Sequence, residues 1–445
     1  MTVATDYRAL SFWHATVADD LTPRPALPGE LSVDVAIIGA GLTGLWTAYS
    51  LQERDPTLRI ALLEKEIAGF GASGRNGGWC SALFPRSTAS LERSHGRDAA
   101  LAMRRAMIDT VDEVGRVVLA QGIECDFAKG GTVAFARTEV QRRAADDDVR
   151  EAERYGVDTL VRRDDGTWDP NCARLHPAKL VRGLARVVEA RGATIYEQTA
   201  VTGWAAGRVE TQRGSVRAGA VILATEGYGA SLAQTRRDVL PLYSLMIATE
   251  PLSDAVWESI GIEHGQTFTD YRHLLIYGQR TADNRFAFGG RGARYHWGSA
   301  IRPEYDRSER VFAHLKTALD ELFPQARSAA VTHRWGGPLG VPRDWHAHVS
   351  FDPDTRIGRA GGYVGDGLST TNLAGRTLAD LVTGAETPLT ALPWVGHRSP
   401  RWEPEPLRFL GSNAGLLAME AADAEERLTR RASVTARVMG PLTGH

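Results

Sequence analysis

The feature that most limits the possible folds is an apolar strand, a glycine turn, an amphipathic helix and a second strand between residues 33 and 65. The first three read VDVAIIGAGLTGLWTAYSLQER, and the second strand reads RIALLEK. Apolar runs separated by a segment of helical period predict a βαβ unit. A βαβ unit predicts an α/β fold with a parallel sheet.

The turn of this unit carries the pattern GxGxxG. Gly39 permits the tight turn, Gly41 lets a pyrophosphate approach the backbone, and Gly44 lets the helix pack on the strand. The helix N-terminus then faces the phosphate charge. Glu64 lies 20 residues after Gly44 at the end of the second strand, where an acid binds ribose hydroxyls and disfavours a 2′-phosphate. The unit therefore predicts dinucleotide binding and argues against NADP.

Two further stretches favour FAD over NAD, because FAD is long and must be held at several distant points. The segment 69–78 has five glycines in ten residues and also contains Arg75 and Asn76, which predicts backbone open to close approach. Gly365 to Thr371 predicts a second turn and helix start with hydroxyl caps. Such a helix end can place partial positive charge beside the flavin N1/C2=O edge.

The rest of the chain predicts two interleaved domains. Strand-like segments such as HLLIYGQR and RFAFGGR predominate between about 240 and 340, which indicates a separate antiparallel sheet. We expect an α/β protein with a discontinuous Rossmann-type FAD-binding domain and an inserted α+β substrate domain. The expected division is 1–32 as an N-terminal arm, 33–95 with 160–235 and 341–390 as the FAD domain, 96–159 with 236–340 as the substrate domain, and 391–445 as a helical tail.

Four motifs together resemble the D-amino-acid oxidase-like FAD-dependent oxidoreductases. They are DVAIIGAGLTGLWTAYSL, LLEKEIAGFGASGRNGGW, VILATEGYG and GGYVGDGLSTTNLAGRTLADL. The form GASGRNGGW and the arm SFW…PRPALPGELSVDVAIIGAG look closest to the branch that contains gamma-glutamylputrescine oxidase. The similarity spans roughly residues 10 to 385, and it is more specific for the cofactor than for the substrate.

The resemblance implies noncovalent FAD and a set of residues that hold it. Val201 matches the position whose backbone faces adenine. Asp366 departs from the pattern, because relatives often carry histidine or an uncharged residue there, and we expect it to cap a turn. The implied cofactor residues are Gly39, Gly41, Gly44, Glu64, Ser73, Arg75, Asn76, Gly77, Gly78, Val201, Gly365, Gly367, Leu368, Ser369, Thr370 and Thr371.

The resemblance also implies a reaction, in which hydride passes from a carbon bearing an amine to flavin N5 and leaves an imine that water hydrolyses. Catalysis of this kind depends on positioning. The candidates at the substrate are Trp335, Tyr271, Arg291 and Arg343, with Tyr277 and Arg334 also considered. Each has a simpler interpretation too, since a tryptophan before two glycines or a tyrosine in a strand is common in cores and a given arginine is usually on the surface.

Composition excludes several kinds of partner. A net charge of −2 gives no reason to expect nucleic acid or an anionic membrane, and no apolar run reaches the length of a membrane helix. Cys80, Cys125 and Cys172 are too widely spaced for a disulfide framework or a metal pair, which favours a cytoplasmic protein without a metal. The oligomeric state stays open.

Three functions remain possible on the sequence. The first is an oxidase of amines or amino acids that uses molecular oxygen and releases hydrogen peroxide. The second is a dehydrogenase that passes electrons to a quinone or a protein. The third is a flavin-binding protein without turnover. Some relatives place a lysine beside flavin N5 to assist oxygen, and this chain has none between Lys179 and Lys316.

Overall fold

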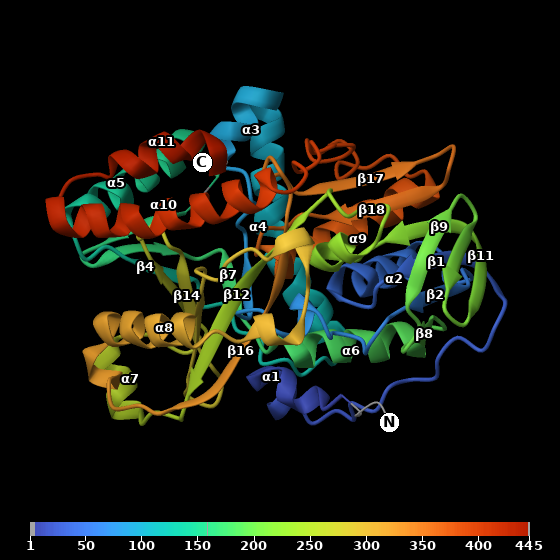
Figure 1. Cartoon of the computed structure of the whole chain (residues 1–445), viewed down its shortest axis with the longest axis horizontal. Helices are drawn as coiled ribbons and strands as arrows, with labels where there is room; N and C mark the ends of the chain where they lie inside the picture. The colour runs from blue at the N-terminus through green and yellow to red at the C-terminus, as the bar shows by residue number, and fades with distance from the viewer. Residues whose placement is uncertain (1–4, 158, 444–445) are drawn as a thin grey trace.

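The computed structural model describes residues 5–157 and 159–443, which form an α/β fold built on two large sheets (Figure 1). The first, the nucleotide sheet, contains the predicted βαβ unit. Its strand order is β17 (His348–Asp352), β18 (Ile357–Gly361), β11 (Gly214–Leu223), β1 (Leu31–Ile38), β2 (Ile60–Leu63) and β8 (Thr194–Tyr196), with β10 (Arg208–Thr211) and β9 (Val201–Ala205) added beside β11.

The centre of the nucleotide sheet is parallel, as the βαβ unit predicts. Strand β1 pairs in parallel with β11 and β2, β2 with β8, and β11 with β18, whereas β17 is antiparallel. Strand β2 is buried throughout, and β1 is buried over its last four residues. Carboxyl ends of parallel strands meet at one edge of a sheet, so the glycine turn after β1 and the acid after β2 lie together.

Helices cover the nucleotide sheet and form the largest core with it. Helix α2 (Leu42–Arg54) contacts α6 (Pro177–Ala190) and α9 (Gly367–Thr383), and α9 contacts α4 (Arg97–Ala120). The residues of α4 that face this core include Met103, Met107 and Val111. The sequence assigned 97–120 to the substrate domain, but the apolar face of this helix packs within the nucleotide core.

The second sheet lies beside the first, on the left in Figure 1. Its order is β16 (Val331–Val341), β12 (Leu240–Thr249), β15 (Phe286–Gly290), β14 (Ile276–Arg280), β13 (Thr267–Asp270), β4 (Thr132–Phe135), β6 (Gly166–Asp169) and β5 (Val161–Arg163). All its pairs are antiparallel except β13 with β4. Helices α7 (Asp254–Ile260) and α8 (Glu309–Leu322) belong with this sheet, and α8 packs on it through Val311, Phe312 and Leu315.

Two segments differ from the expected division of the chain. Strands β5 and β6 lie within 160–235, assigned to the FAD domain, yet they hydrogen-bond into the second sheet. The helical tail begins only at residue 407, with α10 (Leu407–Thr429) and α11 (Val434–Thr443). Helix α10 is tied to the second sheet, because the carboxylate of Asp423 accepts hydrogen bonds from the backbone N–H groups of His273 and Leu274.

The remaining elements connect these layers. They are the 3-10 turns η1 (Tyr7–Leu10), η2 (Ala72–Gly74), η3 (Glu226–Ser231), η4 (Trp297–Ser299), η5 (Pro303–Asp306) and η6 (Pro324–Ala326), helices α1 (Phe12–Thr16), α3 (Thr88–His95) and α5 (Glu139–Tyr155), and the strand pair β3 (Trp79–Ser81) and β7 (Cys172–Arg174). In the part of the chain that the structure describes, no helix combines the length and apolar character needed to cross a membrane.

Candidate active site

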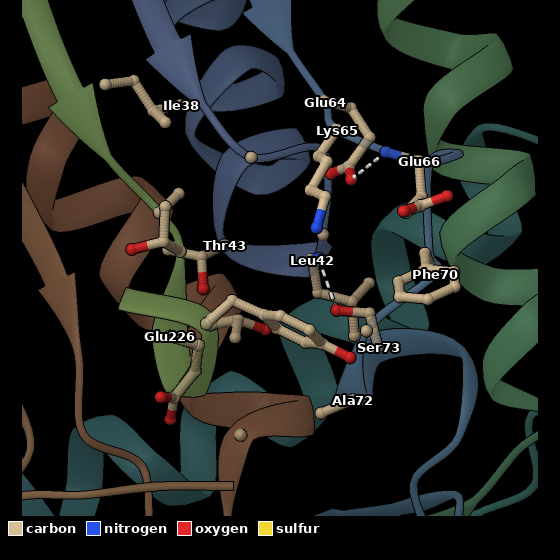
Figure 2. Close-up of a pocket in the computed structure, with 18 of the residues that line it drawn as sticks. Ile38, Leu42, Thr43, Glu64, Lys65, Glu66, Phe70, Ala72, Ser73 and Glu226 are labelled. Atoms are coloured by element: carbon tan, nitrogen blue, oxygen red, sulfur yellow. Dashed lines mark hydrogen bonds between the residues drawn. The ribbon is translucent and has the colours of Figure 1, made fainter. Parts of the chain in front are cut away.

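A long cavity follows the carboxyl edge of the nucleotide sheet. It reaches from Glu64 and Val201, past the N-terminus of α2, to the N-terminus of α9 (Figure 2 shows the part around Glu64, Ser73 and Glu226). Its walls come from segments hundreds of residues apart. The predicted cofactor residues that line it are Gly39, Gly41, Glu64, Ser73, Asn76, Val201, Gly365, Gly367, Leu368 and Thr371.

The glycines of the GxGxxG turn are required by close contacts. Gly39 has a φ of +105°, and a Cβ there would lie 2.7 Å from the carbonyl oxygen of Ala224. A Cβ on Gly44 would lie 2.1 Å from the carbonyl oxygen of Gly39. Gly44 does not line the cavity, and its role is to let α2 approach the turn. Because Gly41 is the N-cap and has no side chain, the start of α2 stays accessible to a phosphate.

Glu64 and Ser73 fix the two sides of this turn. Glu64 Oε2 accepts a hydrogen bond from the N–H of Ala40 at 2.9 Å, and Oε1 accepts one from the N–H of Glu66 at 2.9 Å. Burial raises the pKa of Glu64 to about 7, against the lowering effect of these two hydrogen bonds. Ser73 Oγ accepts a hydrogen bond from the N–H of Leu42 at 2.8 Å (Figure 2). An acid thus lies where a ribose would bind.

Arg75 does not line the cavity. Its guanidinium donates to Asp306 Oδ2 at 2.6 Å, to the Tyr228 hydroxyl at 2.8 Å and to the carbonyl oxygens of Phe70 and Gly336. Through these four hydrogen bonds, the Arg75 side chain connects the glycine-rich turn to the second sheet. We expected Arg75 to hold the cofactor, but its side chain lies outside the cavity lining.

The rest of the glycine-rich turn divides between the cavity and the second sheet. Asn76 lines the cavity, but its side chain holds the turn, donating to the Ala72 oxygen and accepting from the N–H of Gly78. A Cβ on Gly77 would lie 2.6 Å from the ring of Tyr277, and one on Gly78 would lie 2.1 Å from Gln279 Nε2. Gly77 and Gly78 are therefore needed for the approach of β14, which the sequence did not indicate.

The N-terminus of α9 closes the far end of the cavity. Gly365 has a φ of +113° and lines the cavity with Thr371. Ser369 and Thr370 do not line it, because their hydroxyls donate to the carbonyl oxygens of Ser81 and Asp366. Only part of the hydroxyl-rich start of this helix is thus available to a cofactor.

Asp366 occupies the N-cap position of α9 without capping it. Its side chain makes no cap hydrogen bond, contrary to our expectation that it caps a turn. Burial raises the pKa of Asp366 to about 6, and the positive charge of Arg291 acts in the opposite direction. The carboxylate therefore does not cap its own helix, and it interacts electrostatically with Arg291, which follows β15 of the second sheet.

Of the four substrate candidates, only Arg291 lies by this end of the cavity. It donates to the carbonyl oxygen of Val364 at 3.1 Å, directly before Gly365. Trp335 is 1% exposed, and its indole donates to the backbone oxygen of Arg75. Its place is in the core.

Tyr271 and Arg343 are engaged elsewhere. The Tyr271 hydroxyl hydrogen-bonds to Thr167, and Arg343 pairs with Glu403 at 2.9 Å. Tyr277, considered beside Tyr271, interacts electrostatically with Arg291. Arg334 lies in β16 and is exposed.

Glu226 is a cavity residue that the sequence interpretation missed. It has a φ of +44°, its Oε1 accepts a hydrogen bond from the N–H of Tyr363 at 3.1 Å, and its Oε2 is buried without a partner among the described residues. Burial raises the pKa of Glu226 to about 7. The available signal was a carboxylate shortly after the buried strand in VILATEGYG, where the carboxyl edge of the sheet begins.

Cys80 does not line the cofactor cavity. It is fully buried in β3 within the nucleotide core, and burial raises the pKa of its thiol well above the usual value. A thiol of this kind is neutral and inaccessible. Within the described residues, no group of three or more His, Cys, Asp or Glu side chains could hold a metal ion.

Comparison with known protein families identifies the family to which the chain belongs. The model of the family described as FAD dependent oxidoreductase matches residues 34–381. The chain belongs to this family. The FAD dependent oxidoreductases bind FAD, and the cavity fits that cofactor, because glycine cradles, an acid and two helix N-termini lie along its length.

Relatives within the FAD dependent oxidoreductases extend over most of the chain. Gamma-glutamylputrescine oxidoreductase of Escherichia coli is 30% identical over 398 residues, covering 84% of this chain and 89% of its own. The probable oxidoreductase OrdL of Haemophilus influenzae is 30% identical over 394 residues, covering 82% and 86%.

Solved structures share the fold of this FAD dependent oxidoreductase. Glycine oxidase from Geobacillus kaustophilus superposes with a TM-score of 0.69 at 21% identity, covering 83% of this chain and all of its own. L-Proline dehydrogenase from P. horikoshii gives 0.66 at 17%, covering 82% and 96%. These likenesses establish the Rossmann-type FAD domain with its partner sheet.

Proposed function

We propose that the protein oxidises an amine or an amino acid at the carbon that bears the nitrogen. The observation that carries this proposal is the position of Arg291 and Asp366, which form no ion pair among the described residues, at the α9 end of the FAD cavity. The names of the relatives, an oxidoreductase of gamma-glutamylputrescine and a structural neighbour that is a glycine oxidase, support it.

FAD, when bound, supplies the hydride acceptor. The residues of this chain bind it and orient the substrate. Gly39 and Gly41 expose the turn to the pyrophosphate, Glu64 accepts from ribose hydroxyls, and Gly365 with Gly367 opens the start of α9 to the pyrimidine edge. Arg291 pairs with a substrate carboxylate, because a guanidinium matches a carboxylate in a two-pronged geometry. The product imine hydrolyses in water to a carbonyl compound and an amine or ammonia.

We infer that oxygen is the electron acceptor and that hydrogen peroxide is released. The glycine oxidase among the structural neighbours supports this choice, and the L-proline dehydrogenase supports the alternative of a quinone or protein acceptor. A third candidate is a flavin-binding protein that does not turn over.

The test is anaerobic reduction of the bound flavin by a panel of amines and amino acids, followed by exposure to air. Bleaching at the flavin absorbance band by at least one substrate is the expected result. Rapid return of the colour with peroxide release then supports an oxidase. If the colour returns only after a quinone is added, the protein is a dehydrogenase. If no compound bleaches the flavin, both the oxidase and the dehydrogenase proposals are contradicted.

A further inference from the structure

Two opposite charges, for which the described residues provide no ion pair, lie beside the α9 end of the cofactor cavity. Asp366 sits between Gly365 and Gly367, which both line the cavity. An aspartate at an N-cap ordinarily accepts a hydrogen bond from its own helix. The carboxylate of Asp366 makes no such bond, and among the described residues it has no other hydrogen bond or ion pair.

Arg291, which follows β15, supplies the positive charge. Its guanidinium makes one hydrogen bond, to the Val364 oxygen at 3.1 Å, and lies 5.2 Å from the ring centroid of Trp345. Burial lowers the pKa of Arg291, and Asp366 raises it. Within residues 5–157 and 159–443, most of the five donors of this guanidinium have no protein acceptor.

The two charges interact without forming an ion pair. Each influences the titration of the other, yet no nitrogen–oxygen distance between Arg291 and Asp366 falls within 4.0 Å. The space next to them is open, because a Cβ on the exposed Gly365 would meet only Leu339, at 3.7 Å. Both side chains are partly exposed, so each can be reached by a ligand. Two opposite charges that do not pair with each other suit a ligand that brings both complementary charges.

We propose that the substrate is a zwitterionic amino acid, held with its carboxylate on Arg291 and its ammonium on Asp366, and that Asp366 takes the ammonium proton. This inference rests on the proposed function. The step is R–NH₃⁺ plus Asp366–COO⁻ giving R–NH₂ plus Asp366–COOH, with no oxidant involved. It produces the neutral amine that hydride transfer requires.

The surroundings of Asp366 suit a proton acceptor near neutral pH. Burial raises its pKa to about 6, and Arg291 keeps it from rising further. Of the other titratable groups nearby, the Tyr277 hydroxyl hydrogen-bonds to Ser244, and Glu226 accepts from the Tyr363 N–H through Oε1. Glu226 lines the same cavity with a pKa raised to about 7, so the shift in Asp366→Asn, and not the wild-type profile alone, identifies Asp366. A base with the pKa of Asp366 is mostly ionised at pH 7 and still accepts a proton readily.

The first test is binding of inert ions to the FAD-loaded protein, measured by calorimetry. The probes are acetate, tetramethylammonium and betaine, none of which has an N–H group to lose. Asp366→Asn is expected to weaken tetramethylammonium and betaine at least tenfold and to leave acetate unchanged or tighter. Arg291→Gln is expected to weaken acetate and betaine at least tenfold and to leave tetramethylammonium unchanged or tighter. The matched control, Asp147→Asn on the exposed face of α5, is expected to change none of them.

The second test is the pH dependence of kcat/KM with an amino acid that bleaches the flavin. The wild-type value is expected to rise through an apparent pKa near 6 and then level off, because ionised Asp366 is required. In Asp366→Asn the rise moves about two or more pH units higher, to the pKa of the free substrate ammonium. Asp366→Glu keeps the carboxylate, so kcat/KM is expected to rise at low pH as in the wild type. This variant tests the role of the charge even where Asp366→Asn folds poorly.

The outcomes separate the two proposals. Unchanged tetramethylammonium binding in Asp366→Asn, or an unchanged pH profile, overturns the role of Asp366. If the opposite effects on acetate and tetramethylammonium are found but no amine bleaches the flavin, the zwitterion site stands and the proposed oxidation fails.

Discussion

Trp13 and Trp335 lie edge to face with 6.2 Å between ring centroids, and their indole N–H groups donate to the backbone oxygens of two successive residues. Trp335 donates to Arg75 at 2.9 Å, and Trp13 donates to Asn76 at 2.8 Å. One indole comes from the N-terminal arm and the other from the second sheet. The glycine-rich turn beside the cavity is thus held from both sides.

Replacing Trp335 by phenylalanine removes one of these hydrogen bonds and keeps an aromatic ring in the core. We expect the free energy of unfolding to fall by about 1 kcal/mol for the lost bond, and FAD to bind less tightly because the Arg75–Asn76 backbone is released. Urea unfolding and fluorescence titration of the apoprotein with FAD measure the two effects.

Trp394 offers the matched control. It is fully buried, and its indole nitrogen has no hydrogen-bond partner among the described residues. Trp394→Phe therefore loses packing volume but no hydrogen bond, and FAD affinity is expected to stay at the wild-type value. Equal loss of FAD affinity in both variants would refute a specific role for the Trp335 bond.

The second prediction concerns two helical glycines. Gly44→Ala places a Cβ 2.1 Å from the Gly39 oxygen, a backbone atom that cannot move without opening the turn. We expect loss of bound FAD and a drop in unfolding free energy of roughly 3 kcal/mol, comparable to overpacking a core. Gly411→Ala in α10, where no atom lies within 4 Å, is expected to stabilise the protein by up to about 1 kcal/mol. Purification of yellow Gly44→Ala protein of normal stability would contradict the assignment.

The nucleotide half of the fold and the antiparallel sheet between about 240 and 340 could be predicted from local sequence, but the contacts between the two halves could not. The order strand, Gly39–Gly44 turn, helix and Glu64 is encoded within about thirty residues, so pattern and spacing suffice. Three of the four partners of the Arg75 side chain, Tyr228, Asp306 and Gly336, lie more than 150 residues away. No local pattern distinguishes an arginine that binds phosphate from one that connects two sheets.

Contacts between distant residues also decide which of the substrate candidates lie near the cavity. Tyr271 and Tyr277 lie six residues apart in one predicted hairpin, and only the pairing of the strands shows that Tyr277 is the one near Arg291. The apolar face of 97–120 predicted a helix correctly, but a helix carries no information on which of two cores it joins.

The third prediction concerns the thiols. Cys80, Cys125 and Cys172 are all buried, and burial raises the pKa of each. We expect no reaction with a thiol reagent at pH 8 in the native protein and full modification in urea. Acid precipitation is expected to leave the flavin in the supernatant, because no cysteine lines the cavity in the part of the chain described. Yellow colour that stays with the denatured chain would refute noncovalent binding.

The fourth prediction concerns the pH dependence of apoprotein stability at Glu226. Its pKa is about 7 in the folded protein, above the value near 4.3 of an unfolded glutamate. Between these values the folded state holds a proton that the unfolded state has released, so stability is greatest below the unfolded pKa and falls as pH rises to 7. The loss from this group is on the order of 3 kcal/mol. Glu226→Gln carries no titrating proton, so its unfolding free energy is expected to fall less than that of the wild type between pH 5 and pH 7.5 in urea titrations. Glu64 contributes equally to the pH dependence of the wild type and of Glu226→Gln, so its effect cancels when the two unfolding free energies are subtracted. Parallel curves of unfolding free energy against pH for the two proteins would show that Glu226 ionises normally in the cavity wall.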